Sequence, residues 1–131
     1  MVRFILQLMI FVAVGAGQGS CRWVGSESVT VTAEEFRFAP DKIKVRPDHP
    51  FRLIIRNQGR EPHVFQSPQL FREQVRYTRL APFGKMQQGS VITLEPGQST
   101  EMELILPAGV YPFRCWIKGH SGMEGVIVAS N

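Results

Sequence analysis

The sequence lacks an apolar run long enough to cross a membrane comfortably as a helix, which takes about 20 residues. Its N-terminal apolar run, residues 4–16, is shorter. A short basic start precedes this run, and small residues follow it. This pattern predicts a secretory signal peptide over residues 1–20, so we expect a periplasmic or otherwise extracytoplasmic location. Two alternatives stay open: an uncleaved N-terminal anchor, or a lipoprotein signal in which Cys21 is lipidated.

Internal repeats, low-complexity segments and basic residues interleaved with aromatic ones are also missing. Nucleic-acid binding is therefore not expected. The rest of the chain, residues 28–131, has the length of one domain, and we expect a monomer. The formal net charge is +4, and the basic excess lies between Arg37 and Lys85. Such a basic face could meet an acidic redox protein; a membrane partner is expected only if the N-terminus is retained or lipidated.

Apolar and polar residues alternate with a period of two along residues 28–131, most clearly in the segments 29–31, 43–45, 51–55, 102–104 and 111–115. Turn residues such as Pro, Gly and Asn separate these segments. The pattern predicts an all-β sandwich built from short antiparallel strands. Residues 69–89 break the alternation, so we predict a short helix or an irregular excursion there.

Four residues of metal-ligating types occur in an informative order. Cys115, His120 and Met123 follow one another with Cys-x4-His-x2-Met spacing, and His63 lies 52 positions before Cys115. Each of these residues alone would be an ordinary core or loop residue. Together, one thiolate, two imidazoles and one thioether are the ligand set of a mononuclear copper centre that transfers single electrons. Zinc is the chemical alternative, although it gains little from a thioether.

A disulfide is the competing interpretation of Cys115. Exported chains normally pair their thiols, and Cys21 is the other cysteine of the sequence. A Cys21–Cys115 bridge would occupy the sulfur that a metal needs, so the two interpretations exclude each other. If Cys21 is cleaved off or lipidated, metal coordination would protect the remaining thiol.

The third histidine, His49, lies in a turn and is assigned no metal role, so two ligand histidines limit the chain to one mononuclear site. The chain has no His-x-His pair, which excludes multicopper oxidase chemistry. No other catalytic constellation is present, and an enzyme is not expected.

His120 lies between Gly119 and Ser121, so its ring edge is predicted to face solvent, whereas His63 is expected to be more buried. Trp116 either packs against the site or fills the core.

At these residues the chain resembles the cupredoxins, the small blue copper proteins related to plastocyanin, azurin and amicyanin. The resemblance runs from about Val29 to Ser130 and includes Pro62-His63 and the segments 94–99 and 107–115. It implies a Greek-key β-sandwich in which His63 meets the loop 115–123 at one end. It also implies one type 1 copper ion bound by His63, Cys115, His120 and Met123.

Two features depart from that family. The spacing within the loop 115–123 differs from those of plastocyanin, azurin and amicyanin. Val64 also stands where plastocyanin and azurin carry an Asn that ties the two ligand loops together, so this tie must be replaced or absent. The dinuclear copper domain of respiratory oxidases shares the His-x2-Met ending but needs two cysteines around the metals, and Cys21 is too remote to supply the second.

The ligand set predicts an electron carrier that exchanges single electrons with partners such as a c-type cytochrome, an oxidase or a reductase. A periplasmic copper carrier or assembly factor is a second possibility. A non-catalytic copper-binding subunit of a respiratory complex, with residues 69–89 as its contact surface, is a third.

Overall fold

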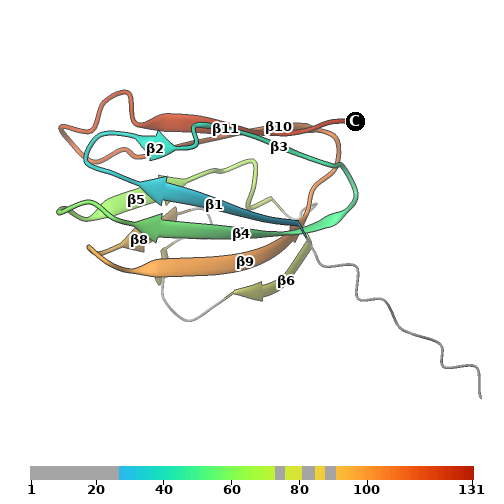
Figure 1. Ribbon diagram of the computed structural model, residues 1–131, viewed down its shortest axis with the longest axis horizontal. Helices are drawn as coiled ribbons and strands as arrows, with labels where there is room; N and C mark the ends of the chain where they lie inside the picture. The colour runs from blue at the N-terminus through green and yellow to red at the C-terminus, as the bar shows by residue number, and fades with distance from the viewer. Residues whose placement is uncertain (1–26, 73–75, 81–84, 88–90) are drawn as a thin grey trace, which may run out of the picture.

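Two β-sheets face each other across an apolar core (Figure 1). The computed structural model describes residues 27–72, 76–80, 85–87 and 91–131. The predicted signal peptide at residues 1–20 and Cys21 lie outside the described residues. Within the described ranges, no membrane-spanning helix is found.

Among the described residues, the first sheet has five strands in the order β2-β1-β4-β9-β6. These are β1 (Glu27–Ala33), β2 (Phe38–Ala39), β4 (Pro50–Asn57), β6 (Arg76–Leu80) and β9 (Ser99–Ile105). The described part of the second sheet has six strands in the order β3-β11-β10-β5-β8-β7. These are β3 (Lys42–Val45), β5 (His63–Gln66), β7 (Lys85–Gln87), β8 (Val91–Leu94), β10 (Gly109–Arg114) and β11 (Glu124–Ala129).

The period-two pattern of the sequence matches the burial pattern of the strands. In β4, Phe51, Leu53 and Ile55 are buried, and the arginines between and after them are exposed. Leu53 lies opposite Met102 of β9, which is also buried. Alternate side chains of a strand point to opposite faces, so each sheet presents one apolar face to the other. The predicted all-β sandwich is confirmed.

Two details of the prediction are wrong. β1 pairs with β4, and β3 with β11, in parallel rather than antiparallel. After β1 and the short β2 the chain crosses to the second sheet for β3 and returns to the first for β4, so β4 can run in the same direction as β1. The short helix, one of the two alternatives predicted for residues 69–89, is also not found in the described part of that segment, which contains the strands β6 and β7 rather than a wholly irregular excursion. Residues 73–75, 81–84 and 88–90 lie outside the described residues.

Gly125 permits close packing where β11 passes the aromatic core. The Phe113 ring stacks on Phe65 with centroids 4.9 Å apart. A Cβ atom on Gly125 would lie 2.4 Å from the Phe113 ring and 2.6 Å from the carbonyl oxygen of Asp41. That carbonyl accepts a hydrogen bond from the amide of Val126, so it cannot move freely.

We therefore expect Gly125→Ala to lower the free energy of unfolding by about 1–3 kcal/mol, as overpacked cores do. Chemical denaturation of the metal-free protein measures this change. Gly109→Ala on the neighbouring strand β10 is the matched control, since its Cβ would lie 3.4 Å from Tyr111, close to ordinary contact. Equal stability of the two variants would contradict the packing argument.

Candidate metal centre

His63, Cys115 and His120 come together at one end of the sandwich. His63 begins β5, and Cys115 directly follows β10, which pairs with β5 through Arg114 and Gln66. His120 lies in the loop between β10 and β11. One ligand atom from each of the three residues lies within 4.8 Å of the others. The structure thus brings together three of the four residues that the sequence predicts as metal ligands.

The loop 115–123 is held in shape by its own backbone. The amide of Cys115 donates to the carbonyl of Met123 at 2.9 Å, and the amide of Met123 donates to the carbonyl of His120 at 3.1 Å. Gly119 and Gly122 have φ angles of 95° and 87°, a left-handed conformation that favours glycine. Each of these glycines directly precedes a predicted ligand, so the turns set the directions of His120 and Met123. Met123 is buried in this loop.

His63 is buried, and neither of its ring nitrogens has a hydrogen-bond partner among the described residues. Its Nε2 lies against Gly59, where a Cβ atom would approach it to 2.7 Å. Nδ1 is therefore the nitrogen left to bind a ligand. Burial, and secondarily the nearby His120, lower the pKa of His63 below its usual value. The imidazole is thus held in the neutral form that a metal requires.

A buried polar group without a partner costs about 1–3 kcal/mol, so the unpartnered His63 ring indicates that a ligand belongs there. The donor set fits copper. Cys115 is a free thiol in this structure, and its Sγ accepts a hydrogen bond from the amide of Val64 at 3.5 Å. One cysteine sulfur close to two imidazoles, with a buried thioether in the same loop, is typical of a type 1 copper site.

The predicted exposure of His120 is wrong, because its ring is buried. Its Nε2 lies 3.1 Å from the carboxylate Oε2 of Glu61. The Phe36 ring makes an edge contact with the His120 ring, with centroids 5.7 Å apart. Phe36 and Glu61 therefore lie between His120 and solvent, and both are themselves exposed. Trp116 also fills no core position, since 58% of its surface is exposed.

Asn57 ties the His63 segment to the sheet. It is fully buried, and its Nδ2 donates to the carbonyls of Glu61 at 2.8 Å and Leu94 at 2.9 Å. Its Oδ1 accepts a hydrogen bond from the amide of Gly59 at 2.8 Å. This network fixes the chain that leads into His63, although Val64 replaces the Asn of plastocyanin and azurin. A buried Asn at a strand end before a Gly turn is the sequence signal for this role.

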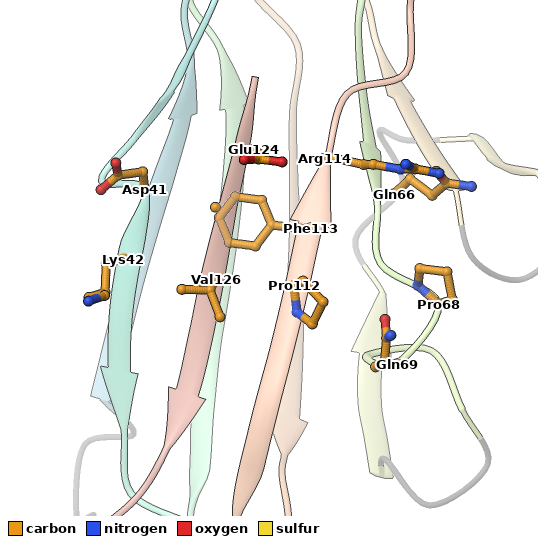
Figure 2. A pocket seen from close by; sticks show the side chains of 11 residues that line it. Asp41, Lys42, Gln66, Pro68, Gln69, Pro112, Phe113, Arg114, Glu124 and Val126 are labelled. Carbon is orange, nitrogen blue, oxygen red and sulfur yellow. The ribbon is translucent and has the colours of Figure 1, made fainter. Parts of the chain in front are cut away.

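A separate open groove lies on the outer face of the second sheet, over β3, β11, β10 and the end of β5 (Figure 2). Arg114 and Gln66 lie side by side on its wall, with Nε of Arg114 donating to Oε1 of Gln66 at 3.2 Å. Lys42 and Arg114 on its lining are balanced by Asp41 and Glu124. The groove contains none of the residues of the metal-ligating cluster.

Comparison with known proteins agrees with this geometry. The family model described as "Cupredoxin-like domain" matches residues 5–129. No curated protein matches the sequence.

Solved structures of auracyanins share the fold. Auracyanin B matches with 18% identity and a TM-score of 0.55, over 80% of this chain and 89% of its own. A sodium-dithionite-reduced auracyanin from the photosynthetic bacterium Roseiflexus castenholzii matches with 15% identity and a TM-score of 0.57, over 81% of this chain and 98% of its own. Auracyanin A, a "blue" copper protein from the green thermophilic photosynthetic bacterium Chloroflexus aurantiacus, matches with 15% identity and a TM-score of 0.56, over 81% of this chain and 100% of its own. The family match covers nearly the whole chain, and the chain therefore belongs to the cupredoxin-like family.

Proposed function

We propose that this chain is a one-electron carrier whose ligands are His63, Cys115, His120 and Met123. The observation that carries the proposal is the closed, prearranged cluster of a free thiol and two imidazoles, with His63 otherwise unpartnered. When bound, copper would supply the Cu(II)/Cu(I) couple. The residues of the chain hold the donors in fixed places, so that little rearrangement accompanies the change of charge.

The chain's own hydrogen bonds support this role. The amide of Val64 donates to Sγ of Cys115 and helps to hold the sulfur in its place beside the two imidazoles. Backbone hydrogen bonds within the loop 115–123 restrict the positions of His120 and Met123. Low exposure of His63, Cys115 and His120, at 1%, 6% and 2%, leaves little surface for a substrate, which favours a carrier over an enzyme.

Copper delivery is the second candidate. A delivery site is expected to be open and exchangeable, whereas His63, Cys115 and His120 are all buried, and Phe36 and Glu61 contact His120 on its outer side. We further propose an exported, periplasmic location and a redox protein as partner, such as a c-type cytochrome, an oxidase or a reductase. These follow from the predicted signal peptide and from the proposed chemistry.

The test is to load the protein with Cu(II) and record its visible spectrum and its voltammogram. A carrier should give an intense thiolate-to-copper band and a reversible one-electron wave. A colourless Cu(I) adduct that a chelator strips readily would instead support delivery. Absence of copper binding would contradict both functions.

Met123→Leu is expected to keep copper bound but raise the reduction potential. The substitution conserves volume and removes only the weak thioether donor. Because this donor stabilises Cu(II) more than Cu(I), its loss raises the potential. Voltammetry measures the shift. Met102→Leu is the matched control, because Met102 is a buried methionine on β9 of the opposite sheet. Equal potentials in the two variants would remove Met123 from the proposed ligand set.

A further inference from the structure

The two nitrogens of His120 have different neighbours. Nδ1 lies 3.6 Å from Sγ of Cys115, within the cluster. Nε2 lies 3.1 Å from Oε2 of Glu61. The His120 side chain is 3% exposed, whereas that of Glu61 is 63% exposed. The solvent-facing carboxylate of Glu61 thus contacts Nε2 of the buried His120 ring, whereas Cys115 faces Nδ1 of the same ring.

Glu61 reaches this position through a fixed backbone. Its carbonyl accepts a hydrogen bond from the buried Asn57, which also bonds the carbonyl of Leu94 on β8. The backbone that carries the Glu61 carboxylate is therefore anchored to the second sheet. The edge of the Phe36 ring contacts the His120 ring at an interplanar angle of 86°. A hydrogen bond and an aromatic edge together restrict the rotation of His120.

We propose that Glu61 is a positioning residue for His120. A neutral imidazole carries one proton, so a carboxylate that accepts Nε2–H leaves the lone pair on Nδ1, the nitrogen that faces Cys115. The carboxylate fixes this tautomer and the ring orientation, as outer partners of metal-bound histidines commonly do. Its negative charge also favours the more positive oxidation state of a bound metal, which lowers the reduction potential. Only this last effect rests on the proposed electron-carrier function.

An exposed ion pair contributes little to stability on its own. The Glu61 contact differs because one partner is a buried ring within the cluster. Its effect is therefore expected on ring geometry and metal retention more than on the stability of the fold. Because the carboxylate faces water, its influence on the potential should weaken as the salt concentration rises.

The test compares Glu61→Ala and Glu61→Gln with a matched control, Glu35→Gln. Glu35 is a neighbouring carboxylate whose Oε1 accepts a hydrogen bond from the amide of Arg60. Burial lowers the pKa of His63, and the charges of Glu35 and Glu61 both partly oppose that shift, so each carboxylate acts electrostatically on the cluster. Glu61→Gln and Glu35→Gln remove the same charge, but only Glu61 contacts the His120 ring.

Nitrogen NMR of the metal-free protein at pH 8 should show the Nε2–H tautomer of His120 in the parent, in Glu61→Gln and in Glu35→Gln. Glu61→Ala should show a mixture of tautomers.

A Cu(I) chelator should remove the metal about 10-fold faster from Glu61→Ala than from the parent. Glu61→Gln should remain within about 3-fold of the parent, because its amide oxygen still accepts the hydrogen bond. Its potential should nevertheless rise above that of the parent and of Glu35→Gln at low salt.

Parent-like tautomer and removal rate in Glu61→Ala would overturn the proposal. Equal shifts of potential in Glu61→Gln and Glu35→Gln would overturn the specific charge effect, since net charge alone would then explain it. If the parent shows no reversible wave, the electron-carrier function fails, but the tautomer and the removal rate still decide the role of Glu61.

Discussion

Replacing Cys115 by serine is expected to abolish the intense visible band of the copper-loaded protein. The band arises from charge transfer between a thiolate and the metal, and a hydroxyl neither ionises near neutral pH nor supplies a soft donor. The structure leaves Cys115 free, with its Sγ within reach of both imidazoles. Absorption spectra at equal protein concentration, with copper content measured separately, check this outcome. We expect copper affinity to fall as well, because one of the strong donors is lost.

Cys21→Ser is the matched control for this experiment. It removes the other cysteine thiol of the chain and should leave the band unchanged. A band retained in the Cys115→Ser protein would exclude the proposed thiolate ligand. A loss of colour in Cys21→Ser that equals the loss in Cys115→Ser would indicate that both sulfurs serve the metal.

Period-two alternation predicted much of the sandwich, because which face of a strand a side chain occupies depends only on its position relative to its neighbours in the sequence. Phe51, Leu53 and Ile55 are buried as the alternation requires, and Tyr111, Phe113 and Cys115 share the inward face of one segment. That face directs the thiol of Cys115 towards the core side, where His63 also lies. Once two facing sheets are assumed, His63 and Cys115 can therefore be expected to lie close together, although they are far apart in the sequence.

The surroundings of the cluster could not be predicted in the same way. A glycine and a serine beside His120 indicated an exposed loop, but its burial depends on Phe36 and Glu61, which come from remote parts of the chain. Asn57 likewise acts through Leu94, 37 positions away. Such contacts depend on how segments pack in three dimensions, and alternation carries no information about them. The parallel pairing of β1 with β4 could not be predicted for the same reason. It arises because the chain passes through the second sheet between these two strands, which alternation does not reveal.

Gly59→Ala is expected to weaken copper binding about 10- to 100-fold, the range found when groups that orient metal ligands are lost. A Cβ atom at this position would lie 2.7 Å from Nε2 of His63, so the imidazole must shift. His63 is fully enclosed, and its movement would carry Nδ1 away from the cluster. A chelator competition titration measures the affinity. The metal-free protein should also lose about 1–3 kcal/mol of stability through overpacking.

A double-mutant cycle separates this contact from a general effect of alanine on the turn. In a His63→Ala background the ring is absent and only the 3.3 Å approach of the added Cβ to Oδ1 of Asn57 remains, so adding Gly59→Ala should cost at least about 0.5 kcal/mol less than it does in the parent. An equal cost in both backgrounds would show that the backbone of the turn, rather than the imidazole, is the sensitive element. The predicted difference between the backgrounds arises because the absence of a side chain at position 59 provides the space that the His63 ring occupies. On this prediction, Gly59 helps to set the geometry of the metal centre although it offers no side chain to bind the metal.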